Sequence, residues 1–244
     1  MDTEQSLSFN QLKELNDRFD QQLQALDGNQ PRAHSFSWKK VLLNVLLGII
    51  ALPLPFFLLV RASVFIYNGY QTNGWLALSI GCLATVLLLL LYGAILVYKF
   101  GMGKKALKYI FRGVLVLVAA YTFYGVLYYS SLNTKTDEIH TYYRSLHPIM
   151  RVALTTVTLA DSEVVVTDIQ RSPEDYQRMG LSEKEHSLHY MQASGYVHAV
   201  DLRTKGRSRW KNWMFEYSFK LLGLSTIRHV GTADHLHVYL PLNK

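Results

Sequence analysis

The sequence predicts three transmembrane α-helices followed by an α+β domain with an antiparallel sheet. Three long apolar runs fill residues 41–130, and the segments on either side carry nearly all of the acidic residues. After these runs, short β-branched stretches and helical patterns share enough chain for one compact domain with its own core. We therefore divide the chain into a cytoplasmic amphipathic helix with a linker at 1–37, a transmembrane region at 38–130 and an extracytoplasmic domain at 131–244.

Composition narrows the classes of function. The net charge of +7 could indicate nucleic-acid binding. Many of the basic residues flank the apolar runs, however, where they anchor and orient helices. No basic stripe interleaved with aromatic residues is present, so we expect no nucleic-acid partner. The single cysteine, Cys82, excludes an internal disulfide and a cysteine-based metal site.

The polar segment 1–37 is too long for the basic region of a cleaved signal peptide, so the first apolar run is expected to be retained. Leucine and phenylalanine recur there at spacings of three and four, as in an amphipathic helix, at Leu12, Leu15, Phe19, Leu23 and Leu26. Gly28, Asn29 and Pro31 are expected to end this helix. We interpret it as a short helix lying on the membrane or on itself, with self-association or partner binding as the alternative.

Three runs have about the 20 apolar residues that cross a hydrocarbon core, at 41–60, 75–97 and 109–129. Pro53 and Pro55 predict a kink in the first. Trp38, Trp75 and Tyr129 lie near the ends of the runs, where aromatic rings contact membrane lipid at the interface. The runs contain no Asp, Glu or His at mid-depth, which argues against transport.

The positions of lysine and arginine predict the orientation. Basic residues precede the first run and cluster between the second and third, at Arg32, Lys39, Lys40, Lys99, Lys104, Lys105, Lys108 and Arg112. The connection between the first and second runs offers only Arg61. This pattern predicts a cytoplasmic N-terminus and a C-terminal domain on the outer side of the membrane. In a bacterium, that is a protein of the cytoplasmic (inner) membrane with a periplasmic or extracellular C-terminal domain.

The C-terminal domain mixes both kinds of element. Residues 136–159 have a helical pattern that Pro148 is expected to break, and 213–222 predict a second helix. Strands are expected at 164–166, 196–202 and 235–240.

Eight of the nine histidines follow residue 131, and their neighbours form recognisable segments. These are Ser187-Leu188-His189-Tyr190, Ala199-Val200-Asp201 and Asp234-His235-Leu236-His237, with Arg171 in the upstream segment 166–173. In this order they resemble the zinc D-alanyl-D-alanine carboxypeptidase and L-alanyl-D-glutamate endopeptidase family, whose domain fold is shared with hedgehog proteins. The family motif is Ser-x-His-x-x-Gly-x-Ala-x-Asp followed by a distant acidic-x-x-His. The resemblance covers roughly residues 148–242.

The resemblance implies that His189, Asp201 and His237 bind zinc (Zn2+). It implies that Asp234 is the general base and that Arg171 holds carboxylate or carbonyl groups of the substrate. Two imidazoles, one carboxylate and an open fourth position form a catalytic type of zinc site. Strand alternation adds that Asp234 should reach the site only from the turn that begins the last strand.

One spacing departs from the family pattern. Eleven residues separate His189 from Asp201, whereas the family has six. Three explanations stay open: an insertion that keeps both ligands, replacement of His189 by His198, or loss of the metal.

The expected function is that of a membrane-anchored zinc metallopeptidase, a D,D-carboxypeptidase or endopeptidase that hydrolyses amide bonds in peptidoglycan stem peptides near D-amino acids. The alternative is a non-catalytic module on the same fold that binds wall peptides or a partner protein.

Overall fold

The computed structural model describes residues 9–28, 37–127, 133–178, 180, 182, 186–231 and 234–242. Its helices are α1 (Phe9–Gly28), α2 (Trp38–Ala51), α3 (Leu54–Tyr70), α4 (Gly74–Lys99), α5 (Lys104–Leu127), α6 (Asp137–Thr141), the 3-10 helix η1 (Tyr142–Ser145), α7 (Pro148–Ala160), α8 (Pro173–Arg178) and α9 (Arg209–Leu222). Its strands are β1 (Asn133–Thr134), β2 (Val165–Asp168), β3 (Ala199–Arg203), β4 (Ser225–His229) and β5 (His235–Tyr239). The sequence features at Asn29, Pro31, Arg32 and Tyr129 lie outside the described residues.

The chain forms two compact units, residues 1–47 and 48–244. In the first unit, α1 is the helix expected from the leucine and phenylalanine spacing. The side chains of Leu12, Leu15, Phe19 and Leu23 along it are exposed.

The apolar helices agree with a membrane protein. By length and composition α4 and α5 could each cross a membrane, and α2 with α3 would form a third span bent by 41°. The bend follows Pro53, whose ring cannot continue the hydrogen-bonding pattern of a helix, so the predicted kink is confirmed. The helix continues to Tyr70, beyond the predicted end of the first run.

The C-terminal domain contains a five-stranded sheet in the order β1-β2-β3-β5-β4. The sheet is mixed, which corrects the antiparallel prediction: β1 pairs in parallel with β2, and the other strand pairs are antiparallel. The connection from β1 to β2 contains α6, η1 and α7, long enough for the crossover that parallel pairing requires. The two-residue β1 is too short to leave a periodic signal in the sequence.

The predicted helix break is confirmed, since α7 begins at Pro148, the helical position that tolerates proline. Helix α7 is buried almost all round because it packs between the apolar helices and the rest of the domain. The predicted strands near 164, 196 and 235 and the helix near 213 are present with shifted ends. Helix α8 and strand β4 were not predicted.

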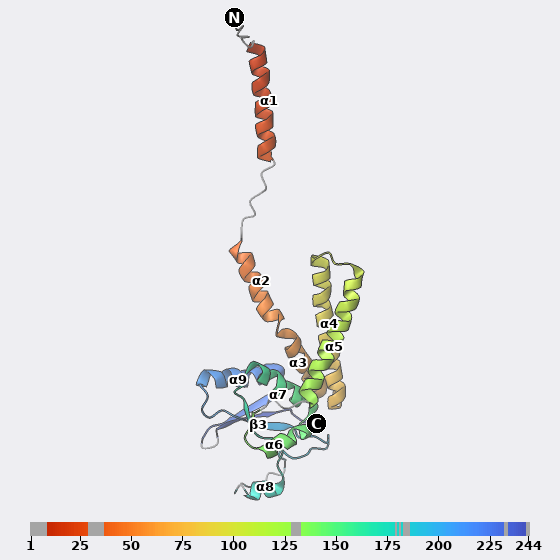
Figure 1. Ribbon diagram of the computed structural model, residues 1–244. Helices are drawn as coiled ribbons and strands as arrows, with labels where there is room; N and C mark the ends of the chain where they lie inside the picture. Colours follow the sequence, from red (N-terminus) through yellow and green to blue (C-terminus); the bar gives the residue numbers. More distant parts are fainter. Residues whose placement is uncertain are drawn as a thin grey trace. The chain divides into compact units, whose positions relative to one another are not determined.

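Helices α3, α4 and α5 belong to the same unit as the domain and pack directly against it (Figure 1). The hydroxyl of Tyr143 donates to the Gly125 carbonyl at 2.5 Å, and Arg151 Nη1 donates to the Val126 carbonyl at 3.0 Å. At the start of α4, Trp75 Nε1 donates to the hydroxyl of Tyr196 at 2.9 Å. The domain is therefore fixed to the ends of two apolar helices.

The imidazole of His147 lies in this contact. Its ring centroid is 4.9 Å from that of Tyr67 and 4.8 Å from that of His198, and a Cβ atom on Gly74 would lie 2.3 Å from its Nε2. Burial, together with the charges of His198 and Arg151, lowers the pKa of His147 to about 3. The folded protein therefore keeps this imidazole neutral.

This neutral histidine predicts a pH-dependent stability. Below pH 6.5, the ordinary pKa of histidine, His147 is protonated in the unfolded chain but stays neutral in the folded chain. The free energy of unfolding should therefore fall by about 1.4 kcal/mol per pH unit as the pH drops from about 6.5 towards 3, and should not depend on this group above 6.5. Equilibrium unfolding of the full chain in detergent between pH 7.5 and pH 5 measures the slope.

The matched control is His147→Phe, which keeps an aromatic ring but cannot titrate. Its slope should be shallower, so that by pH 5 the pH-dependent loss is about 2 kcal/mol smaller than in the unsubstituted chain. Equal slopes for the two proteins would contradict the assignment.

Candidate metal centre

Strand register brings two of the candidate ligands together. Asp201 on β3 is directly opposite His237 on β5, and Asp168 on β2 is opposite Asp201 on its other side. Side chains directly opposite each other lie on the same face of a sheet. A slip of one residue would turn His237 to the other face, so the pairing of β3 with β5 determines whether the site exists.

His189 reaches this face from the segment that precedes β3. The Arg171 amide donates to the His189 carbonyl at 3.1 Å, and the His198 amide donates to the Leu188 carbonyl at 3.0 Å. These two backbone hydrogen bonds hold the segment with Leu188 and His189 between the residues at Arg171 and those at His198.

The residues that lengthen the spacing between His189 and Asp201 form a closed turn. The Gln192 amide donates to the Tyr196 carbonyl at 3.0 Å, and the Gly195 amide donates back to the Gln192 carbonyl at 2.9 Å. Gly195 has φ of 77°, a backbone conformation that favours glycine. The additional residues thus project as a turn, and His189 lies beside Asp201 despite the long spacing.

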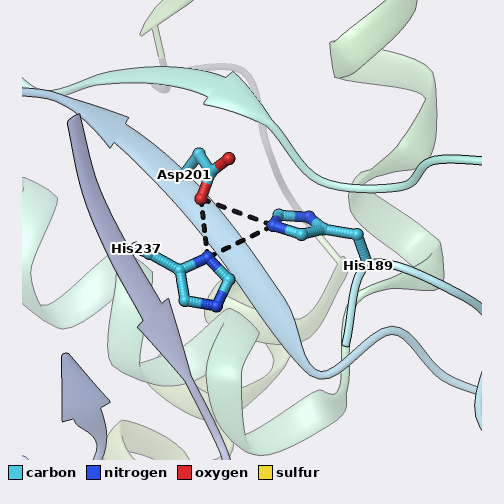
Figure 2. A group of neighbouring side chains, drawn as sticks. All are labelled: His189, Asp201 and His237. Atoms are coloured by element: carbon cyan, nitrogen blue, oxygen red, sulfur yellow. Dashed lines mark hydrogen bonds and ion pairs between the residues drawn. The ribbon is translucent and has the colours of Figure 1, made fainter. Parts of the chain in front are cut away.

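The three side chains converge, and Figure 2 shows the two rings and the carboxylate pointing toward one another. His189 Nε2 lies 3.4 Å from Asp201 Oδ1 and 3.3 Å from His237 Nδ1, and the last two atoms are 2.8 Å apart. Ligands about 2.0–2.1 Å from a tetrahedral ion lie about 3.3 Å from one another. Two of the three separations have this value, and the cluster could hold a metal ion.

The protein orients the His189 ring through its other nitrogen. Nδ1 lies 2.7 Å from the Ile169 carbonyl oxygen. A carbonyl can only accept, so this contact assigns the proton to Nδ1 and leaves the lone pair of Nε2 facing Asp201 and His237. Metal-binding histidines usually donate their second N–H group in this way.

Arg171 lies in the site, but its donors are engaged by protein carboxylates. Nη2 donates to Asp201 Oδ2 at 2.7 Å, and Nε donates to Asp168. Two aspartates directly opposite each other on neighbouring strands would repel, and the guanidinium between them compensates. The structure therefore shows Arg171 positioning Asp201. Its predicted contact with substrate stays a prediction.

These contacts determine the charge of Asp201. Burial disfavours its ionised form, but the hydrogen bond from His237 and the charge of Arg171 outweigh burial and hold its pKa far below the usual range. Asp201 is thus an anion, the form that binds a metal.

Asp234 lies just before β5, as the alternation argument predicted. Its carboxylate accepts from Arg228 Nε and Nη2, both at 3.1 Å, and from Thr204 Oγ1 at 2.7 Å. Among the described residues these are its partners, and the three ligands are not in hydrogen-bonding contact with it. Hydrogen bonds from Arg228 and Thr204 lower the pKa of Asp234.

His198 lies apart from the cluster. Its Nε2 is 2.8 Å from Ser194 Oγ and its Nδ1 is 3.3 Å from the Leu240 carbonyl, while its ring packs on His147. The structure therefore brings His189, rather than His198, to Asp201 and His237.

The cluster opens into a cavity of about 1060 Å³, which is also lined by Arg171 and Asp234. Three further residues shape it without having been assigned a role from the sequence: Asp168, Tyr176 and Ser187. Ser187 Oγ lies 2.7 Å from the Tyr176 hydroxyl and accepts from the His189 amide at 3.3 Å. Ser187 belongs to the Ser-x-His pattern, and that pattern is the sequence signal that could have identified it as a site residue.

None of the family models, curated proteins or solved structures compared with this chain matches it.

Proposed function

We propose that this protein is a membrane-anchored zinc metallopeptidase that hydrolyses amide bonds in peptidoglycan stem peptides near D-amino acids. The observation that carries the proposal is the convergence of His189 Nε2, Asp201 Oδ1 and His237 Nδ1 beside a cavity large enough for a peptide. Two imidazoles and one carboxylate, with His189 and Asp201 buried and the His189 ring oriented through its Nδ1, are donor types that suit a catalytic zinc site.

Each residue has a defined task in this proposal. His189, Asp201 and His237 hold the metal. A bound zinc ion lowers the pKa of a water molecule to about 7 and polarises a carbonyl group. Asp234 accepts the proton of the attacking water on a carboxylate oxygen and returns it to the leaving amine nitrogen, as the water oxygen bonds to the carbonyl carbon and the C–N bond breaks.

Arg171 keeps Oδ2 of Asp201 occupied, so that Oδ1 faces the two imidazoles. The substrate class comes from the motif resemblance. Basic residues flanking the apolar helices favour an orientation with the domain on the outer side of the membrane. In the bacterial cytoplasmic membrane that the motif resemblance implies, this side is periplasmic or extracellular, where stem peptides occur.

A hydrolysis assay tests the proposal. The full chain, purified in detergent, should contain about one zinc per molecule. It should cleave a synthetic stem peptide that ends in D-Ala-D-Ala or contains the L-alanyl-D-glutamate bond, with products identified by mass spectrometry. A chelator should abolish cleavage and added zinc should restore it. If a folded, zinc-loaded chain cleaves neither bond, the proposal that the protein is a peptidase is refuted.

The ion pair of Asp234 with Arg228 favours a second candidate, a binding module on the same fold. A carboxylate held by two guanidinium bonds is a weaker base than a free one. Peptide binding to the zinc-loaded chain without cleavage would support this candidate.

A further inference from the structure

Helix α9 carries an apolar face that the described part of the protein leaves uncovered. Trp210, Trp213, Met214, Tyr217 and Leu221 recur at helical spacing and are between 46% and 64% exposed. We refer to these five residues as the α9 aromatic face. The opposite side of α9, with Phe215, Phe219 and Leu222, is buried in the core and fixes the helix in place. A contiguous exposed apolar surface of this kind usually marks an interaction site.

The rings on this face are ordered. Trp213 stacks on Trp210 with ring centroids 4.9 Å apart and on Tyr217 with centroids 5.3 Å apart. Tryptophan and tyrosine combine an apolar body with one polar atom, and both are enriched where membrane and water meet.

The α9 aromatic face is continuous with the apolar helices. Met214 and Leu221 line a mainly apolar groove of about 1010 Å³ together with Leu52, Pro53 and Phe56, which lie at the break between α2 and α3. That break belongs to the bent pair of helices with the character of a membrane span. Lipid packed around Leu52 and Phe56 in a membrane would therefore also contact Met214 and Leu221.

The direction of α9 also fits a membrane surface. Figure 1 shows α9 lying crosswise to α4 and α5. A helix crosswise to two membrane-spanning helices is parallel to the bilayer plane. Its C-terminal end is fixed to α3, because a Cβ atom on Gly223 would lie 2.4 Å from Arg61 Nη1.

The length of α4 allows for such a helix at the surface. At about 1.5 Å per residue, its 26 residues span about 39 Å, whereas a hydrocarbon core is about 30 Å thick. The first turn of α4 packs on the domain through Gly74 and Trp75. That turn can lie outside the core, so α9 can lie at the membrane boundary while α4 still crosses it.

One basic side chain beside this face favours an anionic lipid surface. Arg209, the first residue of α9, is exposed, and a cation near anionic headgroups contributes about 1 kcal/mol of attraction. The neighbouring cations are engaged elsewhere: Arg207 pairs with Asp161, Lys211 pairs with Glu163, and Arg203 and Lys205 line the cavity beside the metal cluster.

We propose that α9 lies in the boundary between headgroups and acyl chains of the bilayer leaflet on the side of the C-terminal domain. Its aromatic face is buried in lipid, and acyl chains fill the groove beside Leu52. This goes beyond the proposed peptidase activity and does not depend on it. The interaction holds the domain against the membrane at a further place besides the ends of α4 and α5.

A site-specific fluorescent label tests the proposal. In a Cys82→Ser background, Tyr217→Cys puts a label on the α9 aromatic face, and Met191→Cys puts a control label on a loop residue of similar exposure, 51% against 48%. The full chain is reconstituted at one copy per nanodisc, with mixed zwitterionic and anionic lipids and a spin-labelled lipid that quenches near the top of the acyl chains. A second label at Trp210→Cys replaces the first if Tyr217→Cys does not fold.

The label on α9 should lose at least about half of its fluorescence to the spin-labelled lipid, because an interfacial helix buries its apolar face about 5–10 Å into the boundary. The label at position 191 should instead be quenched by aqueous iodide. Equal iodide quenching at both positions would overturn the proposal. Protection of position 217 only in discs that hold two copies would overturn it as well, and would assign the face to self-association.

Discussion

Replacement of His189 by glutamine is expected to weaken zinc binding by more than about 100-fold. Loss of a residue that merely orients a ligand already costs about 10- to 100-fold in affinity, and His189 would supply a ligand atom itself. Its Nε2 lies within 3.4 Å of both other ligand atoms. Metal analysis after dialysis and competition with a chromophoric chelator would measure the loss.

His198→Gln is the matched control. Both histidines are buried and both precede β3, but His198 contacts Ser194 and the Leu240 carbonyl rather than the cluster. The control should keep its zinc. Loss of zinc from the folded His198 variant, with retention in the His189 variant, would mean that His198 is the ligand. Retention in both would refute the site.

Asp234→Asn is expected to lower kcat/KM for stem-peptide cleavage by about 100- to 10,000-fold, the usual contribution of a general base. Its zinc content should not change, because the Asp234 carboxylate contacts Arg228 and Thr204 rather than a ligand. Cleavage and metal content measured on the same preparation separate the loss of a base from the loss of metal. Unchanged cleavage would exclude Asp234 as the base.

The ion pair partner supplies an independent readout. Arg228 lowers the pKa of Asp234 by donating to its carboxylate. In Arg228→Gln that pKa should rise, so the base becomes protonated at a higher pH. The acidic limb of the kcat/KM profile should therefore move to higher pH. An unmoved limb would show that another group is the base.

Local physical signals predicted much of the fold. Proline at 53 and 148 breaks or starts helices through its own ring, whatever surrounds it, and both predictions are confirmed. Apolar length likewise predicted α4 and α5. Elements without a strong local signal were missed: β1 has two residues, and its parallel pairing with β2 depends on a distant crossover.

In the site, too, features with a local sequence signal were predicted and those that depend on tertiary contacts were not. The motif residues His189, Asp201 and His237 were named from the sequence, and the structure brings them together. How the long spacing is accommodated depends on a turn that closes through backbone hydrogen bonds between Gln192 and Tyr196. Spacing alone could not reveal those bonds.

The charged partners of the site residues could not be predicted from the sequence either. The sequence predicts that Arg171 holds substrate, which stays a prediction, but it did not indicate that Arg171 spans Asp168 and Asp201. Asp234, just before β5, pairs with Arg228 on the neighbouring strand β4. Ion pairs of this kind depend on strand register, which a single sequence does not specify.

The contacts of η1 and α7 with α5 limit where the cavity can act. The Tyr143 hydroxyl is bonded to the Gly125 carbonyl and Arg151 to that of Val126, and α7 packs on α3, α4 and α5, so these contacts hold the domain against the apolar helices. In a membrane the cavity would therefore move with the chain in two dimensions and stay at a constant distance from the bilayer surface. For the proposed peptidase, encounters with substrate would depend on lateral diffusion of the whole chain, and only peptide bonds at one fixed height above the lipid would come within reach of the cavity.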